Sequence, residues 1–385
     1  MKILYRHRTR GQAVEAVHIE GMARGFRELG YEVDFSSPLM VQVGSNRHTL
    51  KNKILRTISL KAPTIVYEFL MLLFNIISYT RTKKMLKKNK YDFIYERYAF
   101  FDFSLLFLKR NFKVHIVLEV NGAVNRKDPT HGRKIVLKKF ACYLERKVFN
   151  TCDLIVVVST SLKNSLREIG VEPGKILVLP NAVDTERFDR SVSGEEIRRK
   201  YDLENKKIIG FVGSFTFWHG LHFLIQNMSD VLDSNEDTHL LLVGSGREKE
   251  KIKEMIKRFG IENSVTMTGQ VPHEKVPYYI AAMDIGVMPD SNDFGSPMKI
   301  FEYMVMGKPV VSAKYRPTSE VILNGKNGFL FEPKNGHEFV ALIIRLLENH
   351  DLRNSIGING ANYVSEHHTW ESNAHKVLEA CRAIS

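Results

Sequence analysis

The sequence has little cysteine and no cysteine motif. Its three cysteines, Cys142, Cys152 and Cys381, are scattered over 385 residues, and none forms a C-x-x-C pair. This usage argues against a disulfide framework or a zinc site and favours a reducing compartment. The N-terminal residues 1–12 also lack the apolar segment of a secretory signal, so we predict none.

Repeats, low-complexity tracts and clustered aspartates are also missing, which argues against a solenoid or a disordered chain. The spacing of the aspartates in the second half is that of loop and helix-end residues, not of metal ligands. These aspartates include Asp233, Asp237, Asp284 and Asp290. We therefore predict no obligatory metal or other cofactor.

One apolar run, residues 62–79, approaches the length of a bilayer span, but it contains Pro63, Glu68 and Asn75. A central carboxylate is costly in hydrocarbon, so we interpret the run as a buried or interfacial helix. Basic segments, 47–61 and 81–90, flank it, as in helices that lie on an anionic membrane surface. The alternative is a core helix whose basic flanks are merely solvated.

The positive charge belongs to the first part of the chain. Residues 1–150 have a net charge of +17 and residues 151–385 a net charge of −4, within a total of +13. This field favours anionic partners of the first part, such as a phospholipid surface, a polyphosphate or nucleic acid.

Apolar, β-branched runs alternate with helical periodicity along the chain. Because these runs are continuously apolar, they are typical of parallel strands buried on both faces. The polar segment 183–207 interrupts the alternation and predicts a linker. The sequence therefore predicts an α/β protein with two doubly wound, Rossmann-like domains. The expected strands are 1–7, 31–37, 91–97, 114–120, 152–159, 175–181, 207–215, 239–246, 264–271, 284–290 and 308–313.

The segment 294–311, FGSPMKIFEYMVMGKPVV, predicts a helix over about 297–306. Ser296 is a favoured N-cap, Pro297 a favoured first helical residue, and Gly307 a helix stop. The first turn of such a helix presents unpaired amides and the positive end of the dipole, so it can bind an anion.

Two ionic residues lie within this apolar helix. A cation at Lys299, in the first turn, opposes the helix dipole unless an anion such as a diphosphate is bound there. Glu302 lies on the same face and could accept two hydrogen bonds from a vicinal diol such as a ribose. Met298, Phe301 and Val305 are expected to face the core. The alternative is a surface ion pair on a half-exposed helix.

Two glycine turns end predicted strands, at 213–214 and at 244–246. Parallel strands bind ligands at their carboxyl ends, where glycine lets a ligand approach the backbone. Each turn alone is an ordinary tight turn, and neither has the G-x-G-x-x-G pattern. Together with His219 and the Lys299–Glu302 helix, they predict a phosphate-bearing nucleotide ligand.

The chain resembles the retaining family 4 (group 1) glycosyltransferases of GT-B fold over nearly its whole length. The resemblance implies two Rossmann-like domains that face an interdomain cleft, with an acceptor domain at 1–185 and a nucleotide-sugar donor domain at 186–366. A final helix, 367–385, would cross back to the first domain. The resemblance rests on the motifs YDFIYERY (91–98), VLEVNGAV (117–124), CDLIVVVSTSLKNSL (152–166), ILVLPNAVDTERF (176–188), FVGSFTFWHG (211–220), LLVGSG (241–246) and SPMKIFEYMVMGKPVV (296–311).

By this resemblance, Glu302 matches the second Glu of the family's E-x7-E motif and contacts the donor ribose. Lys299 and the amides of 296–298 would hold the diphosphate. The nucleobase loop would fall at Gln270 and Val271. The expected donor-binding residues are Gly213, Ser214, His219, Gly244, Gly246, Gln270, Val271, Asp293, Gly295, Ser296, Pro297 and Met298.

The sequence departs from the family pattern at two places on the donor side. Phe294 stands where the first Glu of the motif is expected, with Asp293 as the nearest acid, which leaves the donor sugar open. The usual Arg and Lys of the first glycine turn are absent, and Lys299 is expected to supply the charge. A branch of the family with WHG and SPxKxFEYM resembles the chain in both respects.

On the acceptor side the family's usual His is not evident, and Glu119 and Asn121 are the candidate catalytic residues. A Glu that ends a buried strand is costly without a role or a partner. Arg97 is expected to pair with Glu96, and His18 to be a surface or half-buried residue.

The expected activity is a retaining glycosyl or hexosyl transfer from a nucleotide-diphosphate-sugar to a glycan or lipid-linked acceptor, in polysaccharide or glycolipid synthesis. The expected location is cytoplasmic, peripheral on the membrane. Alternatives are an epimerase, which should have acidic and histidine clusters in its glycine loops, and a phosphorylase, which needs a cofactor lysine. A nucleic-acid-binding protein is a further alternative, but its interleaved basic and aromatic residues are lacking, so we expect no nucleic-acid partner.

Overall fold

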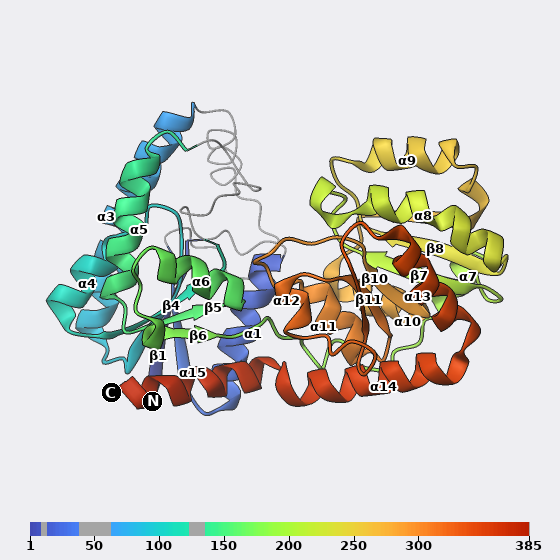
Figure 1. Ribbon diagram of the computed structural model, residues 1–385. Helices are drawn as coiled ribbons and strands as arrows, with labels where there is room; N and C mark the ends of the chain where they lie inside the picture. The colour runs from blue at the N-terminus through green and yellow to red at the C-terminus, as the bar shows by residue number, and fades with distance from the viewer. Residues whose placement is uncertain (9–13, 38–62, 123–134, 385) are drawn as a thin grey trace. The chain divides into compact units, whose positions relative to one another are not determined.

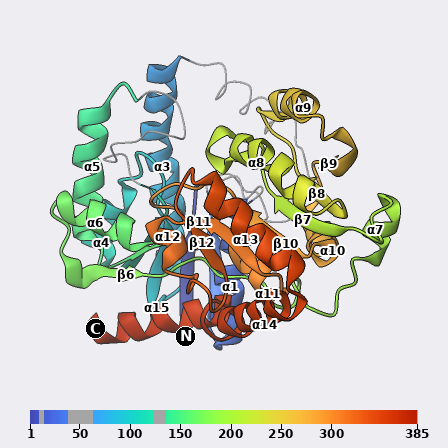
Figure 2. The same cartoon turned by 45° about the vertical axis from the view of Figure 1, so that its right-hand side comes forward.

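The computed structural model describes residues 1–8, 14–37, 63–122 and 135–384. The chain forms two compact units: unit 1 contains Met1–Leu179 and Asn373–Ser385, and unit 2 contains Pro180–Ser372. Each unit has a six-stranded parallel sheet with helices packed against it (Figures 1 and 2). The predicted architecture of two doubly wound α/β domains is confirmed.

Unit 1 has the strand order β2-β1-β3-β4-β5-β6. Its strands are β1 (Lys2–Arg6), β2 (Glu32–Ser36), β3 (Phe93–Arg97), β4 (His115–Val120), β5 (Leu154–Val157) and β6 (Ile176–Val178). Its helices are α1 (Val14–Glu28), α3 (Thr64–Lys88), α4 (Ser104–Phe112), α5 (Lys138–Thr151) and α6 (Thr160–Glu168), with the 3₁₀ turn η1 (Pro173–Lys175).

Unit 2 has the strand order β12-β11-β10-β7-β8-β9. Its strands are β7 (Lys207–Val212), β8 (Thr238–Val243), β9 (Val265–Gly269), β10 (Ile285–Met288), β11 (Val310–Ala313) and β12 (Phe329–Phe331). Its helices are α7 (Glu195–Lys200), α8 (Leu221–Ser234), α9 (Lys249–Arg258), α10 (Val276–Ala282), α11 (Met298–Val305), α12 (Arg316–Ser319), α13 (Gly336–Glu348) and α14 (His350–His367). The 3₁₀ turns are η2 (Phe217–His219), η3 (Glu262–Ser264) and η4 (His273–Lys275).

The two faces of the unit 2 sheet carry separate cores. On β8, Leu240 and Leu242 pack into one core, and Leu241 and Val243 pack into the other. Successive strand residues point to opposite faces, so a strand covered on both faces must be apolar throughout. Burial of the strands on both faces therefore explains the continuous apolar runs of the sequence. The short β12 was not predicted.

In each sheet, later strands lie on both sides of the first strand. In unit 2, β7 lies between β8 and β10, and in unit 1, β1 lies between β2 and β3. At such a switch point the connections leave the carboxyl ends of adjacent strands in opposite directions, which opens a crevice for ligands. The loops after β7 and β10 are therefore the expected site in unit 2.

Helix α3 has its polar side chains buried and its large apolar side chains exposed. Its fully buried residues are Glu68, Asn75, Ser78 and Thr82. Its exposed apolar residues are Ile65, Val66, Phe69, Leu73, Ile76 and Ile77. This is the reverse of the usual arrangement of a helix on a protein surface. We expected a buried or interfacial helix from the sequence, but not this reversed burial of polar and apolar side chains.

Hydrogen bonds hold this inner face to unit 1. Glu68 accepts from the amides of Val136 and Leu137, at distances of 2.7 and 2.9 Å. The Asn75 amide nitrogen donates to the Phe101 carbonyl at 2.9 Å. Its oxygen accepts from the amide of Phe103, also at 2.9 Å. These contacts satisfy backbone groups at the starts of α4 and α5 that a helix leaves unpaired.

Among the described residues, no helix combines the length and the apolarity needed to cross a bilayer. The basic segment 81–90 includes the last turns of α3, whereas the basic segment 47–61 lies outside the described residues.

The last helix, α15 (Trp370–Ile384), carries the chain back from unit 2 to unit 1. Ala374, Val377 and Leu378 are buried on its inner face. Unit 1 therefore consists of two segments from opposite ends of the chain.

We expect Asn75→Ala to destabilise unit 1 by about 2–3 kcal/mol, because it leaves the Phe103 amide and the Phe101 carbonyl buried without their partner. The matched change Thr80→Ala, at an exposed position of the same helix, should alter stability by no more than about 0.5 kcal/mol. Urea denaturation, with hydrogen exchange of the β3 and β4 amides as a probe of unit 1, measures both. Equal stabilities of the two variants would contradict the role of Asn75.

Candidate functional site

The predicted donor-side residues gather at one edge of the unit 2 sheet. Gly213 and Ser214 follow β7, Gly244 and Gly246 follow β8, and Gln270 and Val271 follow β9. The loop after β10 and the start of α11 contain Asp293, Gly295, Ser296, Pro297, Met298, Lys299 and Glu302. Because all the strands are parallel, these loops lie at the same edge, which includes the switch point between β7 and β10.

The turn after β7 meets the lysine of α11. Gly213 has a φ of 147°, a conformation that favours glycine. A Cβ at this position would lie 2.8 Å from Nζ of Lys299. The ammonium group thus lies against the backbone of the glycine turn.

Lys299 is a buried cation that bonds to no carboxylate of the described residues. Its side chain is only 9% exposed, and its Nζ has no hydrogen-bond partner among the described residues. Nζ lies 4.0 Å from the centre of the Phe211 ring. Burial lowers the pKa of Lys299 to about 7, although the charge of Glu302 acts in the opposite direction. A surface ion pair with Glu302, the alternative from the sequence, is therefore wrong.

The first two glycine turns pack directly on each other. Gly244 has a φ of 140°, and a Cβ there would lie 1.9 Å from the carbonyl oxygen of Gly213. The Gly244 amide donates to the Gly269 carbonyl at 3.0 Å, which ties the end of β8 to the end of β9. The loops after three adjacent strands thus form one continuous backbone surface.

Ser296 does not cap α11, contrary to the prediction. The helix begins at Met298, and its N-cap, Pro297, has no side-chain hydrogen bond. Instead, the Ser296 hydroxyl accepts from the Asn181 amide at 3.0 Å, and the Asn181 side chain donates to the Ser296 carbonyl at 2.6 Å. The hydroxyl is therefore used to hold the loop to the segment after β6, and the amides of the first helical turn have no side-chain cap.

Helix α11 is buried from Lys299 to Val305, so it has no polar face. Of the predicted inward residues, Phe301 and Val305 are buried, but Met298 is half-exposed. The Tyr303 hydroxyl accepts from the Val212 amide at 2.6 Å and fixes the helix to the end of β7. A carboxylate and an ammonium group are therefore held rigidly inside this apolar helix.

Glu302 is oriented by His273, which no sequence pattern indicated. Nε2 of His273 lies 3.3 Å from Oε1 of Glu302, and Nδ1 of the same ring lies 2.9 Å from the guanidinium of Arg187. A guanidinium only donates hydrogen bonds, so Nδ1 accepts and Nε2 carries the hydrogen that points to Glu302. His273 follows Gln270 and Val271, so it brings the loop after β9 to Glu302. Phe188 packs against the ring edge-on, with centroids 5.6 Å apart.

His219 closes the turn after β7. Its Nδ1 donates to the Ser214 carbonyl at 2.6 Å, and its ring lies 5.8 Å from that of Phe211. Since Phe211 also contacts Lys299, the histidine and the lysine flank the same ring.

The loop after β10 is ordered by short local hydrogen bonds. The Asn292 side chain accepts from the amides of Phe294 and Gly295. Asp290 accepts from the Tyr315 hydroxyl at 2.6 Å. Asp293 is exposed, and Phe294 occupies the position where the family has its first Glu.

In unit 1, Glu119 is buried at the end of β4 and fully hydrogen-bonded. It accepts from Arg97, Asn121 and, at 3.1 Å, Tyr95, and it lies 3.5 Å from Nδ1 of His18. Burial alone would raise the pKa of Glu119, but His18 and Arg97 hold it below its usual value. The structure thus brings Glu119 and Asn121 together.

Two expectations about unit 1 were wrong. Arg97 pairs with Glu119, and Glu96 pairs with Arg6. These are register partners on adjacent strands, and neighbours in a strand such as Glu96 and Arg97 point to opposite faces. His18 is buried rather than exposed or half-exposed, because α1 places it against Glu119.

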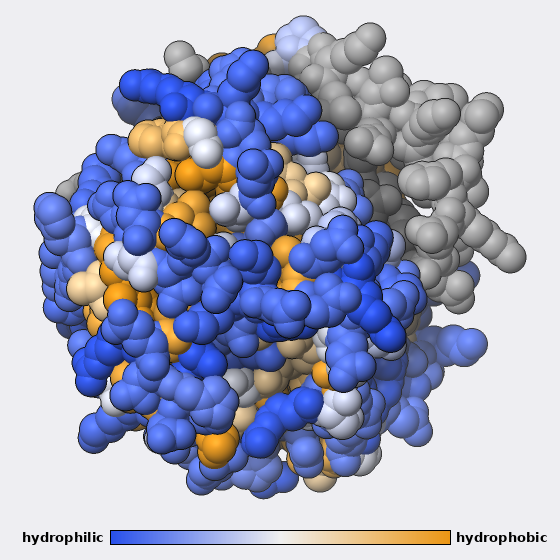
Figure 3. All heavy atoms as spheres, turned by 90° about the vertical axis from the view of Figure 1, so that its right-hand side faces the viewer, coloured by the Kyte–Doolittle hydropathy of each residue, from blue (hydrophilic) through white to orange (hydrophobic). Residues whose placement is uncertain are grey.

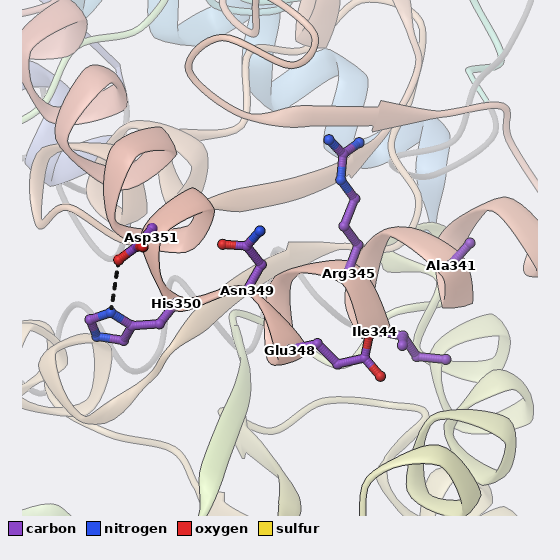
Figure 4. Close-up of a pocket in the computed structure, with 7 residues that line it drawn as sticks. All are labelled: Ala341, Ile344, Arg345, Glu348, Asn349, His350 and Asp351. Carbon is purple, nitrogen blue, oxygen red and sulfur yellow. Dashed lines mark ion pairs between the residues drawn. The ribbon is translucent and has the colours of Figure 1, made fainter.

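A cavity of about 720 Å³ lies elsewhere in unit 2, at the junction of α13 and α14 (Figure 4). Its side chains do not converge on one point, and the ion pair between His350 and Asp351 lies to one side. Its lining residues are Ala341, Ile344, Arg345, Glu348, Asn349, His350 and Asp351. It contains none of the glycine turns. Within the described ranges, no three His, Cys, Asp or Glu side chains are grouped so that they could hold a metal ion.

Two family models match adjacent parts of the chain. The model described as "Glycosyl transferases group 1" matches residues 193–363, and the model described as "Glycosyltransferase Family 4" matches residues 16–187. Together they span nearly all of both sheets.

Similar proteins agree with these matches. An uncharacterized glycosyltransferase of Methanocaldococcus jannaschii is 27% identical over 74% of each chain. A GDP-mannose-dependent alpha-(1-6)-phosphatidylinositol monomannoside mannosyltransferase of Mycolicibacterium smegmatis is 22% identical over 65% of this chain and 68% of its own. The crystal structure of HepE from Anabaena, in complex with UDP and glucose, has a TM-score of 0.73 over 100% of both chains, at 18% identity. This last likeness shows the GT-B fold.

The pKa of Lys299 predicts how stability depends on pH. Between about pH 7 and the ordinary lysine value of 10.5, the unfolded chain binds a proton that the folded chain does not, so the free energy of unfolding rises with pH. We expect Lys299→Met to be more stable than the wild type at pH 7, and the difference to shrink as the pH rises toward 10.

Chemical denaturation at several pH values measures this difference. Lys326→Met, at an exposed position, is the control. Its free energy of unfolding should differ from that of the wild type by an amount that does not change with pH. A constant difference for Lys299→Met as well would contradict the assignment of a destabilising buried cation.

Proposed function

We propose a donor and a mechanism on the premise that this chain belongs to the family 4 (group 1) glycosyltransferases. The proposal is that unit 2 binds a nucleotide-diphosphate-sugar and that the chain transfers the sugar, with retention, to a glycan or lipid-linked acceptor. The observation that carries it is Lys299, a buried ammonium group that lies against a glycine turn and has no hydrogen-bond partner among the described residues.

The diphosphate is the part of the donor that Lys299 would bind. A buried charge is costly unless it is paired, and a diphosphate supplies the missing negative charge. The Gly213 amide already donates to the Val243 carbonyl, so the Ser214 amide and the uncapped first turn of α11 would add the amide donors around the same position. HepE, which has this fold, was crystallised with UDP, and this supports a diphosphate nucleotide as the ligand.

The ribose is assigned to Glu302. Its Oε1 faces the Nε2–H of His273, so the carboxylate is held in place while it retains acceptor capacity for a diol. Arg187 and His273 are positioning residues in this proposal, because they act through Glu302. Gln270 and Val271, in the loop that carries His273, would border the base.

The proposed chemistry stabilises the leaving group. Cleavage of the sugar–phosphate bond leaves negative charge on the diphosphate, and preorganised donors at that position stabilise the transition state more than the bound donor. Lys299, the Ser214 amide and the amides of the first turn of α11 would supply this stabilisation. Retention without an enzymic nucleophile requires the acceptor proton to pass to the departing phosphate as the new bond forms on the same face.

The acceptor is assigned to unit 1, with Glu119 and Asn121 as candidate residues at the carboxyl end of β4. Glu119 accepts hydrogen bonds from Arg97, Tyr95 and Asn121, which supports a fixed polar cluster there. The phosphatidylinositol monomannoside named for the Mycolicibacterium relative supports a lipid-linked acceptor and a role in glycolipid or polysaccharide synthesis. We place the reaction in the cytoplasm, where cysteine thiols stay reduced.

We expect nucleotide-sugars to raise the melting temperature of the wild type, and Glu302→Gln to lose most of this shift, since binding stabilises the folded state by mass action. Removing charge-assisted hydrogen bonds to the ribose should weaken binding by about tenfold to a hundredfold. Thermal-shift measurements across UDP-, GDP- and other nucleotide-sugars give the result. Glu366→Gln, at an exposed acid of the same unit, is the control. An unchanged shift in Glu302→Gln would contradict the ribose assignment.

We also expect donor binding to take up protons. Lys299 in the free protein has its pKa lowered to about 7, and a bound diphosphate favours the ammonium form, so at pH 8 binding should take up about one proton. A nucleotide-sugar diphosphate is esterified at both ends and does not titrate near this pH. Calorimetry in two buffers of different ionisation enthalpy measures the uptake. Equal binding enthalpies in the two buffers would argue against diphosphate contact with Lys299, and Lys299→Met should show no uptake.

A further inference from the structure

We propose that the outer face of α3, with the adjoining surface of α5, is a docking surface for an anionic lipid bilayer. This surface consists of the apolar stripe Val66, Phe69, Leu73, Ile76 and Ile77 and of lysines at its two ends. The proposal goes beyond the glycosyl transfer, and vesicle binding can be measured without any sugar donor.

The apolar stripe occupies one side of the helix. Phe69, Leu73 and Ile76 are 59%, 57% and 62% exposed. Their spacing of four and three residues places them in one row, about three helical turns long with Val66 and Ile77. Exposed apolar residues that are clustered in this way mark an interaction site, whereas single ones are ordinary.

The buried polar face shows why the stripe must point outward. Glu68 and Asn75 bond to the starts of α5 and α4. Figure 1 shows α3, α4 and α5 as neighbouring helices. Ser78 accepts from Arg6, and Thr82 lies 3.1 Å from Ser36. Turning the helix to bury its apolar side would break all of these bonds and leave buried groups unpaired. The hydrogen bonds therefore fix the apolar side in an exposed position.

Basic residues lie at both ends of the stripe. Lys84 and Lys87 continue the same row toward the end of α3 and are exposed. At the other end, Glu68 caps the start of α5, where Lys138 and Lys139 are exposed. Phe140 and Tyr143 are also exposed on α5, and aromatic residues of this kind favour the interfacial region of a bilayer.

No carboxylate opposes this charge on the three helices α3, α4 and α5, all of whose residues the structure describes. Their two carboxylates, Glu68 and Glu145, are each only 1% exposed. Their basic residues are Arg81, Lys83, Lys84, Lys87, Lys88, Lys109, Arg110, Lys138, Lys139, Arg146 and Lys147. An apolar stripe between unopposed lysines matches acyl chains bordered by anionic headgroups.

A second copy of the chain fits this surface poorly. A symmetric dimer places the same patch on both partners, so the lysines of the two copies would lie face to face. The exposed apolar residues of unit 2, in contrast, are dispersed. Among those that the structure describes are Phe217, Tyr278, Leu323 and Ile358. The face drawn in Figure 3 likewise shows apolar atoms in small groups separated by polar ones.

Cosedimentation of the full chain with vesicles tests the proposal. We expect binding to vesicles of phosphatidylglycerol and phosphatidylcholine at low ionic strength, weaker binding at high salt, and little binding to phosphatidylcholine alone. The triple variant Phe69→Ser/Leu73→Ser/Ile76→Ser should bind at least about tenfold more weakly. Lys84→Ala/Lys87→Ala should bind roughly thirtyfold more weakly.

Matched variants in unit 2 serve as controls. Leu323→Ser/Ile358→Ser removes two apolar side chains that are each 46% exposed, and Lys253→Ala/Lys257→Ala removes two exposed lysines of α9. Both should bind vesicles as the wild type does. All variants should keep the wild-type melting temperature and the wild-type shift with the nucleotide-sugar.

Three results would overturn the proposal. The first is no binding to anionic vesicles, or equal binding by the triple variant. The second is a dimer in light scattering that the triple variant dissociates, since a second copy would then cover the stripe. The third is a clear loss of thermal stability in the triple variant, since the stripe would then be buried in the free protein. A normal nucleotide-sugar shift in the same samples would leave the proposed function standing.

Discussion

A positive charge enclosed by apolar residues needs a negative partner, and the arrangement of unit 2 follows from this requirement. Lys299 lies inside α11, over the ring of Phe211, where no protein group of the described residues bonds its nitrogen. The parallel sheet places the backbone of three glycine-containing turns at the same edge, and the ammonium group lies against the first of them. Rigid packing of α11 holds this charge in place, and the proposed binding of a leaving diphosphate depends on such preorganisation.

Unit 1 uses buried charge differently, because the buried arginines that the structure describes there are paired with carboxylates. Arg6 pairs with Glu96 on one face of the sheet and Arg97 with Glu119 on the other, in both cases across adjacent strands. Helix α3 extends this polar interior with Asn75, which bonds to the start of α4. Such a network gives the fold a unique arrangement, and it leaves the apolar side of α3 to be covered by something other than the protein's own core.

The sequence was informative where one residue type has one physical meaning. Continuous apolar runs indicated parallel strands, and the segment around Lys299 and Glu302 indicated the helix that carries both residues. The sequence did not indicate which side chains pair with each other across neighbouring strands. The pairing of Arg97 depends on strand register, although the alternation of side chains already excluded Glu96 as its partner. His273 contacts Glu302 through a loop 29 residues away, and no local pattern signals such a contact.

The route of the chain has a consequence for the order in which the protein is made. Unit 2 is one uninterrupted segment, whereas unit 1 is completed only by residues from Asn373 onward. On the ribosome, domains fold as their residues emerge. The later-synthesised unit can therefore finish folding first, while the earlier one waits for the last helix of the chain. A premature stop that removes only the final dozen or so residues would thus damage the half of the protein that was translated first.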